Sequence, residues 1–144
     1  MHLLIVESHP ADVRIISEAV FGVAWDIQAE VASSIEEIGD RIHRADVVLL
    51  EVEESSTAEL QARLAPFLER GERAIVICSV ESDPQVAIEA GYLGAFGSWL
   101  KGGDPKQLVQ TLYCAIGAWR RREDERARLE ALKTQLIERL QADV

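Results

Sequence analysis

The sequence of 144 residues is poor in several features that would set it apart from ordinary globular proteins. Its only two cysteines, Cys78 and Cys114, lie far apart in apolar surroundings, so we expect both to be reduced and buried, and to form neither a disulfide nor a metal pair. No apolar run approaches the roughly 20 residues that span a bilayer. The chain does not open with a basic segment followed by an apolar one, so we expect no signal peptide. These absences predict a cytoplasmic protein that does not bind a membrane.

Sequence motifs of common enzymes and cofactor-binding proteins are also missing. The chain has no glycine-rich phosphate loop, no G-x-S-x-G motif, and no Cys and His residues at metal-binding spacing. We therefore expect a protein that is not an enzyme and has no cofactor. His9, a single histidine in a predicted loop, is expected to be an exposed side chain and not a metal ligand.

Positive charge is scarce relative to negative charge. The chain has 15 basic and 25 acidic side chains, which give a formal net charge of −10. Residues 120–144 hold seven of the basic and six of the acidic side chains, so the excess of acid belongs to the first 119 residues. An acidic body repels phosphate backbones. We therefore expect protein partners, and no nucleic acid, for this segment.

Short apolar runs alternate with amphipathic segments along the chain. The run Val47–Val52 has no polar face, which is typical of a strand buried on both sides, and Glu51 stands near its carboxyl end. Similar runs predict strands at residues 2–6, 25–31, 74–79 and 95–100, and helices at residues 10–20, 34–44, 60–68, 84–90 and from 105 onward. This alternation specifies a parallel sheet with helices on both faces. In such sheets, functional groups gather at the carboxyl ends of the strands.

The last helix is predicted to continue beyond the domain as a C-terminal extension at residues 120–144. This segment contains neither Gly nor Pro and is rich in strong helix formers. A narrow apolar stripe runs along it, formed by Leu129, Leu132, Leu136 and Leu140. The stripe favours a two-stranded coiled coil that would make the chain a homodimer. A solvated helical tail is the alternative, because basic side chains interrupt a strict heptad repeat.

Four segments follow one another on this β-α frame in a characteristic order. They are LLIVESHPADVR at residues 3–14, the strands Val47–Val52 and Ala74–Ser79, and GAFGSWLK at residues 94–101. Together they resemble the CheY-like receiver domains of bacterial response regulators, from residue 2 to about residue 119. The resemblance implies a flavodoxin-like (βα)5 fold with strand order 2-1-3-4-5. It also implies a part in two-component signal transduction, with a sensor kinase or an output domain as partner.

The resemblance assigns functional positions to particular residues. The phospho-acceptor position is Glu51, the acidic pocket is Glu7 and Ser8, and the switch positions are Ser79 and Lys101. Where the family has an acceptor Asp and a second metal-binding carboxylate, this chain has Glu51 and the neutral Ser8. The extra methylene of Glu51 moves its oxygens by about 1.5 Å, and displacements of this size are costly for a reaction that depends on alignment.

These departures favour a degenerate receiver, or pseudo-receiver, that is not phosphorylated in the usual way. We expect Lys101 to pair with Glu51, whose longer side chain would imitate part of a phosphorylated Asp. An inert, solvated Glu51 is an equal alternative. A genuine receiver that accepts phosphate at Glu51 or Glu53 with Mg²⁺ is the alternative for the function as a whole, and a purely structural dimerisation unit is a further one.

A receiver that leads directly into a coiled coil also resembles the AmiR/NasR-type antiterminators, in which an RNA-binding domain follows. The expected organisation is therefore a receiver-like domain at residues 1–119 and a coiled-coil extension at residues 120–144. With this organisation we expect either the N-terminal part of an antiterminator or a stand-alone adaptor.

Overall fold

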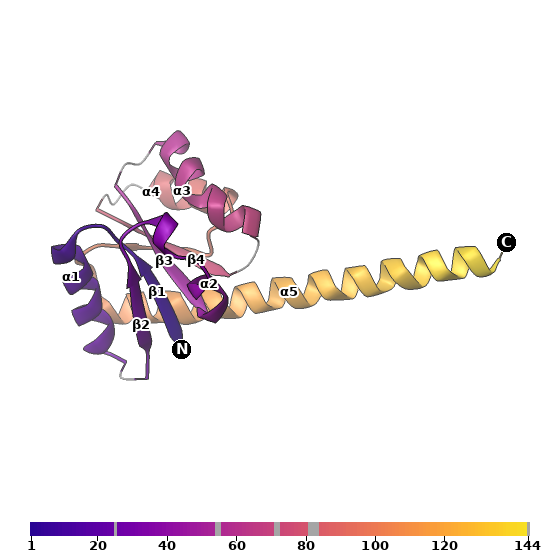
Figure 1. The fold of residues 1–144 in the computed structure, drawn as a ribbon, viewed down its shortest axis with the longest axis horizontal. Helices are drawn as coiled ribbons and strands as arrows, with labels where there is room; N and C mark the ends of the chain where they lie inside the picture. Colours follow the sequence, from indigo (N-terminus) through magenta and orange to yellow (C-terminus); the bar gives the residue numbers. More distant parts are fainter. Residues whose placement is uncertain (25, 54–55, 71–72, 81–83, 144) are drawn as a thin grey trace.

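A five-stranded parallel sheet with helices on both faces forms the body of the protein, and one long helix projects from it (Figure 1). The structure is a computed structural model that describes residues 1–24, 26–53, 56–70, 73–80 and 84–143. In chain order the elements are β1 (His2–Val6), α1 (Pro10–Phe21), β2 (Gln28–Ala32), the 3-10 helix η1 (Ile35–Glu37), α2 (Arg41–Arg44), β3 (Val47–Val52), α3 (Thr57–Arg70), β4 (Ala74–Ser79), α4 (Pro84–Tyr92), β5 (Gly97–Leu100) and α5 (Pro105–Ala142).

The strand order is β2-β1-β3-β4-β5, and every pair is parallel. This arrangement confirms the predicted flavodoxin-like fold and its order 2-1-3-4-5. All residues of β3 and β4 are buried, as their apolar composition predicts, whereas β2 at the sheet edge is mostly exposed. Within the described residues, no helix combines the length and apolar character that crossing a membrane requires.

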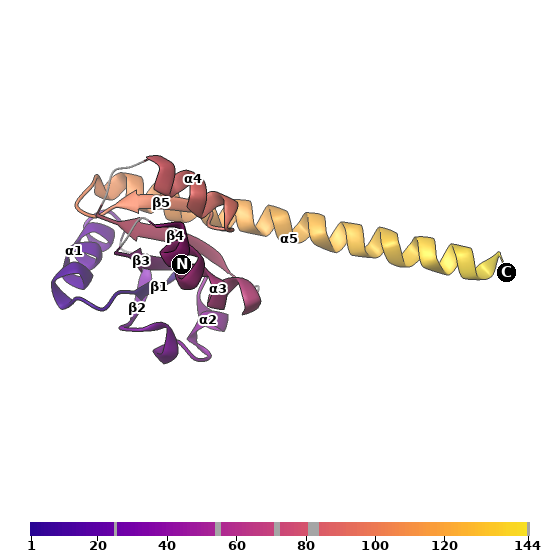
Figure 2. The same ribbon diagram turned by 90° about the horizontal axis from the view of Figure 1, so that it is seen from above.

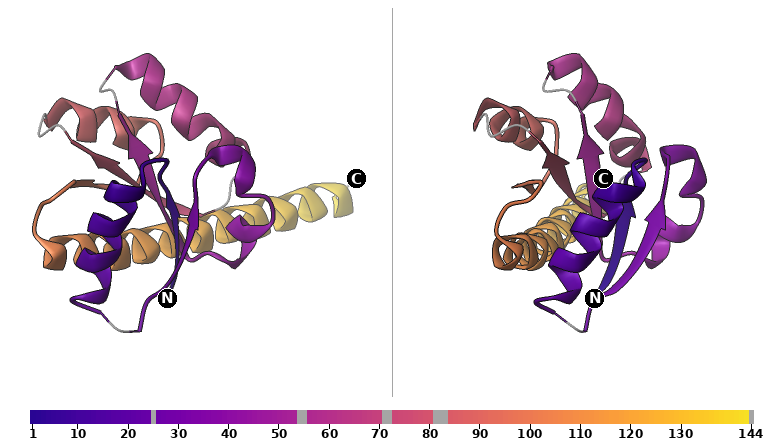
Figure 3. Two further views of the ribbon diagram at one scale, coloured as in Figure 1. Left: turned by 60° about the vertical axis from the view of Figure 1, so that its left-hand side comes forward. Right: turned by 90° about the vertical axis from the view of Figure 1, so that its left-hand side faces the viewer.

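Two apolar cores lie on opposite faces of the sheet, because successive strand residues point to opposite sides. Leu3, Ile5 and Leu49 pack on one side with residues of α1 and α5. Leu4 and Leu50 pack on the other side with residues of α2, α3 and α4. Figure 3 shows the sheet between these two layers of helices. In this class of fold, functional groups gather at the carboxyl ends of the strands.

The prediction of one continuous helix at residues 34–44 is wrong. Two short pieces, η1 and α2, replace it, and Gly39 between them has a φ of +50°. This left-handed conformation breaks an α-helix and suits a residue without a Cβ. Ser34 and Glu37 also form no complete capping box at the start of η1: the Glu37 carboxylate accepts a hydrogen bond from the Ser33 N–H at 3.1 Å, and the Ser34 side chain makes no capping hydrogen bond.

Several element boundaries and one buried residue also differ from the prediction; α3, for example, spans Thr57–Arg70 and not residues 60–68. The second strand is Gln28–Ala32, and Trp25, where the predicted strand began, lies outside the described residues. The last strand begins at residue 97, not 95, and α4 continues to residue 92. Cys78 is buried as predicted, but Cys114 is exposed because it lies beside the buried stripe of α5 and not on it.

The final helix is continuous from the body into the extension. Its 38 residues correspond to a length of about 57 Å. Asp104 caps its start with a side chain that accepts a hydrogen bond from the Lys106 N–H at 3.0 Å. The first turns pack on the sheet, while every described residue from 124 onward is exposed and extends away from the body (Figure 2).

Two stacking contacts hold the helix where it leaves the sheet. The Arg73 guanidinium lies 5.5 Å from the ring centre of Trp119, and the Arg122 guanidinium lies 4.7 Å from that of Phe96. Arg73 also donates hydrogen bonds to the carbonyl oxygens of Ala45 and His43, at 2.8 and 2.9 Å. The direction in which the extension leaves is therefore set by groups of the body.

Candidate functional site

Buried charged side chains meet at the carboxyl ends of the strands. Glu7 follows β1, Glu51 lies in the last part of β3, and Lys101 follows β5. Glu7 is 1% exposed and Glu51 is 3% exposed. The parallel pairing of β1 with β3, of β3 with β4 and of β4 with β5 places these strand ends along one edge of the sheet. The structure therefore brings together Glu7, Glu51 and Lys101, three of the residues that the sequence singled out.

The Lys101 ammonium is held by more carboxylates than the sequence indicated. Its Nζ lies 2.9 Å from Glu7 Oε2, 3.0 Å from Asp12 Oδ2 and 3.8 Å from Glu51 Oε1. The expected partner, Glu51, is thus the most distant of the three. Asp12 was missed, although its place in the first turn of the helix that follows β1 could have indicated it.

Burial and ion pairing act against each other on these groups. Burial raises the pKa of Glu7, the contact with Lys101 opposes this, and the proximity of Glu51 adds to the rise. Burial alone would lower the pKa of Lys101, but its contacts with Glu7 and Asp12 outweigh burial, so that this pKa is raised. The ammonium therefore stays charged, while Glu7 is the carboxyl that takes up a proton more readily than usual.

Ser8 binds Glu51 directly. Its backbone N–H and its hydroxyl both donate hydrogen bonds to Glu51 Oε2, each at 3.3 Å. Arg63 holds the Glu51 carbonyl oxygen with two hydrogen bonds of 3.0 and 3.2 Å. Glu51 is therefore a buried and fixed carboxylate, which contradicts the alternative of a solvated acid at the strand end.

The two switch positions also come together. Ser79, at the end of β4, is 8% exposed, and its carbonyl oxygen accepts a hydrogen bond of 2.8 Å from the Lys101 N–H. Trp99, two residues before Lys101, is buried in β5 and donates its indole N–H to the Asp104 carbonyl oxygen at 3.1 Å. Ser79 and Lys101 therefore flank the acidic site from its β4–β5 side.

His9 and Glu53 form a pair above this site that the sequence did not indicate. His9 Nε2 lies 2.7 Å from Glu53 Oε1 and 3.8 Å from Glu51 Oε1. Both side chains of the close pair are exposed, as predicted for His9. The contact with Glu53 raises the pKa of His9, and the same contact lowers the pKa of Glu53.

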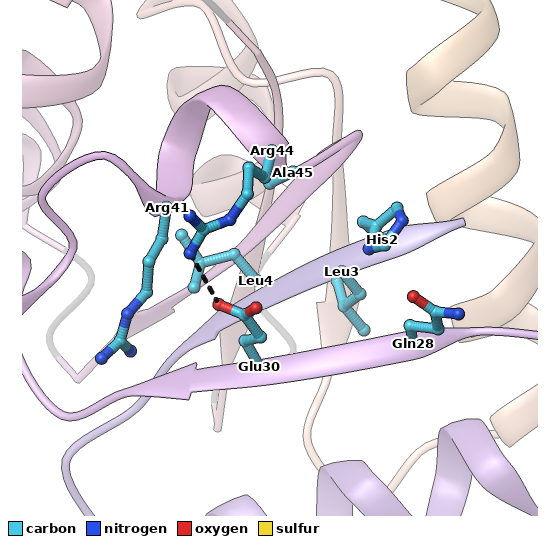
Figure 4. A pocket seen from close by; sticks show the side chains of 8 residues that line it. All are labelled: His2, Leu3, Leu4, Gln28, Glu30, Arg41, Arg44 and Ala45. Atoms are coloured by element: carbon cyan, nitrogen blue, oxygen red, sulfur yellow. Dashed lines mark ion pairs between the residues drawn. The ribbon is translucent and has the colours of Figure 1, made fainter.

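One hollow of the body adjoins the acidic site, and another lies away from it. A hollow of about 190 Å³ adjoins the site and is lined by Ser8, Glu51, Glu53 and Arg63, among others. A larger cavity of about 380 Å³ lies at the opposite ends of β1 and β2, where Arg44 approaches Glu30 at 4.0 Å (Figure 4). The larger cavity is therefore separate from the acidic site.

No protein-family model matches the sequence, and no curated protein is significantly similar to it. Solved structures nevertheless share its fold. The N-terminal domain of a response regulator/sensory box/GGDEF protein from Carboxydothermus hydrogenoformans matches at 18% identity and a TM-score of 0.65, over 85% of this chain and 98% of that one. A response regulator from Thermotoga maritima matches at 17% identity and a TM-score of 0.61, over 81% of this chain and 97% of that one.

A third structure matches the long helix as well as the body. It is described as a trimeric coiled-coil segment of yeast Spc42 fused to another structure, and it matches at 17% identity and a TM-score of 0.63. The match covers 94% of this chain and 95% of that chain. At these identities the similarities establish the fold alone, and that fold is the one found in response-regulator receiver domains.

Proposed function

We propose that this chain is a pseudo-receiver: a two-component signalling domain that is not phosphorylated in the usual way and acts through protein contacts as a dimer. The shared fold supports the signalling role. The observation that carries the loss of phosphorylation is the contact of Ser8 with Glu51, in which a hydroxyl donates to Glu51 Oε2 at 3.3 Å. The site thus holds its carboxylate with a neutral donor.

The residues do not fit the Mg²⁺ site that phosphoryl transfer to a carboxylate needs. Mg²⁺ demands near-octahedral coordination and is bound in proteins through carboxylates. Ser8 supplies no carboxylate, and its hydroxyl donates a hydrogen bond to Glu51 Oε2 at 3.3 Å. No Mg²⁺-dependent transfer follows from this geometry.

The alternative acceptor, Glu53, is no better placed. Its side chain is 57% exposed, and its Oε1 lies 2.7 Å from His9 Nε2. A phosphoryl group on this oxygen would lie at the surface and would have to displace the imidazole. We therefore favour a pseudo-receiver, in which Glu51 is a permanent negative charge, over a receiver that accepts phosphate at either glutamate.

The projecting part of α5 supports dimerisation through a coiled coil. Leu129, Leu132, Leu136 and Leu140 are between 58% and 67% exposed, so the predicted stripe has no partner within the described part of the chain. In this proposal a second copy covers the stripe, and a sensor kinase or an output domain is the protein partner. We further propose that the chain is the N-terminal part of an antiterminator of the AmiR/NasR type. The continuity of α5 from the body into the extension supports this part of the proposal.

Beryllofluoride, which imitates a phosphoryl group on a carboxylate, tests the proposal. Tryptophan fluorescence is the readout, because Trp99 is buried next to the site. We expect no saturable, Mg²⁺-dependent change in the wild-type chain. The double variant Ser8→Asp/Glu51→Asp restores a second carboxylate and a shorter acceptor, so we expect it to respond. A saturable response of the wild-type chain that requires Mg²⁺ would overturn the proposal.

A further inference from the structure

We propose that Glu7, His9 and Glu51, with Glu53 at the rim, bind a divalent transition-metal ion such as Zn²⁺. The existence of this metal site rests on the geometry of the four side chains. Its use as a signal, in place of phosphorylation, rests on the proposed function. In this arrangement His9 supplies a metal ligand next to the position where Ser8 has removed one.

The spacing of the donor atoms fits a small cation. One ligand atom from each of Glu7, His9 and Glu51 lies within 4.8 Å of the other two. His9 Nε2 is 3.8 Å from Glu51 Oε1 and 2.7 Å from Glu53 Oε1. Ligands of tetrahedral zinc lie about 2.1 Å from the metal and therefore about 3.4 Å from one another. The observed distances lie on either side of this value, so small side-chain rotations would complete the site.

A second, independent observation is a buried oxygen of Glu51 that lacks a hydrogen-bond donor. Glu51 is 3% exposed, and its Oε1 has no hydrogen-bond donor among the described residues. Buried polar atoms in proteins nearly always have a partner. This oxygen faces His9 Nε2 and Lys101 Nζ, each at 3.8 Å. A metal ion between His9 and Glu51 would satisfy it.

The charge of the site also favours a divalent cation. Glu7, Asp12, Glu51 and Glu53 bring four carboxylates together, and within the described ranges Lys101 is the one ammonium in contact with them. A bound metal would offset the remaining negative charge. Lys101 would keep a partner if the metal took over Glu7, because Asp12 Oδ2 lies 3.0 Å from its Nζ.

His9 determines which metal the site prefers. Imidazole nitrogen suits zinc, copper and nickel, whereas Mg²⁺ takes oxygen ligands in octahedral geometry. The set of one imidazole and two or three carboxylates therefore selects a transition metal against Mg²⁺. Ser8, which offers no carboxylate, makes the site poorer for Mg²⁺. His9 makes it better for a transition metal, so both residues favour a transition metal over Mg²⁺.

Calorimetric titration of the untagged, chelator-treated full chain with Zn²⁺ tests this inference. We expect one Zn²⁺ per chain, with an affinity at least about tenfold higher than that for Mg²⁺. His9→Gln should lower the zinc affinity by at least about tenfold, since even residues that merely orient a metal ligand contribute 10- to 100-fold. Glu53→Gln should weaken zinc binding less, because Glu53 lies at the rim. Both side chains are exposed, so neither substitution should affect folding.

The matched control is His43→Gln, since His43 lies in α2, whose following residues lead into the opposite end of β3. This variant should bind zinc as the wild-type chain does. Co²⁺ in place of Zn²⁺ should give a visible absorption band that His9→Gln abolishes. Absence of zinc binding, equal binding by His9→Gln and the wild-type chain, or equal affinity for Mg²⁺ would each overturn the site.

The titration contains no phosphoryl donor, so its result is independent of the beryllofluoride experiment. A chain that binds zinc through His9 and also responds to beryllofluoride would keep the metal site and lose the pseudo-receiver function. A chain that responds to neither would keep the pseudo-receiver function and lose the metal site.

Discussion

The Lys101 ammonium links carboxylates from two strands and one helix. Glu7 comes from the end of β1, Asp12 from the first turn of α1 and Glu51 from β3. Because Glu7 and Glu51 are almost fully buried, water screens these interactions poorly. Lys101 is thus paired with carboxylates of the chain itself, and this pairing is the residue-level basis of the pseudo-receiver proposal.

Exchange of Glu53 should change the titration of His9. Glu53 raises the pKa of His9, so the pair is fully formed below the ordinary value of the imidazole and is lost as the pH rises through the raised value. Its contribution to stability follows the same course and is small, because both groups are exposed. In Glu53→Gln the midpoint of the His9 ring-proton signal, followed by NMR with a chelator present, should move to lower pH.

Glu36→Gln is the control, since Glu36 lines the same hollow as Glu53 but is not in contact with His9. It should leave the His9 midpoint close to that of the wild-type chain. An unchanged midpoint in Glu53→Gln would show that the pair does not form in solution.

The sequence predicted which strand ends meet but not which side chains pair. The order of motifs placed Glu51, Ser79 and Lys101 at one edge of the sheet, and the structure agrees. The choice of Glu7 and Asp12 over Glu51 as the close partners of Lys101 depends on differences of about one ångström, which spacing along the chain does not encode. The His9–Glu53 pair joins two loops 44 residues apart and leaves no local pattern.

At the scale of elements, the long periodic segments were predicted best. The apolar runs of β3 and β4 and the stripe of α5 each contain enough residues to fix their type. The segment at residues 34–44 was misjudged because its apolar spacing is helical, whereas the φ of +50° at Gly39 interrupts it. Its isoleucines still reach the core, since Ile38 and Ile42 are 1% and 2% exposed. Tertiary packing therefore needed the apolar side chains but not a continuous helix.

The leucine stripe of α5 should control the oligomeric state. Leu136→Glu places a charge inside the proposed interface, whereas Gln135→Glu places the same charge one residue away from it. Burial of one leucine contributes about 1.5–3 kcal/mol, so Leu136→Glu should weaken the dimer by at least about tenfold. Sedimentation over a range of concentrations would measure this, with Gln135→Glu close to the wild-type chain.

Two results would change this view of α5. A wild-type chain that is monomeric at every concentration would contradict dimerisation through the stripe. A trimer that Leu136→Glu dissociates would retain the interface but correct the number of helices in it. The spacing along the stripe makes the number of helices worth measuring. Two steps of four follow each other, from Leu132 to Leu136 and from Leu136 to Leu140, whereas a strict heptad repeat alternates steps of three and four.

At the scale of the whole molecule, the body and the C-terminal extension differ in charge and in shape. The excess of negative charge belongs to the first 119 residues, while the extension has nearly balanced charges, so two extensions can approach each other without strong repulsion. The stacking of Arg73 on Trp119 and of Arg122 on Phe96 fixes the extension to the body. If the proposed dimer forms through the extension, a partner that binds the body would be held in a set direction relative to the dimer axis.

The intact mass of the wild-type chain after incubation with acetyl phosphate and Mg²⁺ is the most direct test of the pseudo-receiver function. We predict that the mass does not change, because Ser8 holds Glu51 and Lys101 is bound to Glu7 and Asp12. The Ser8→Asp/Glu51→Asp variant, treated in the same way, should gain the mass of one phosphoryl group. A Mg²⁺-dependent gain of that mass by the wild-type chain, lost in Glu51→Gln, would contradict the account.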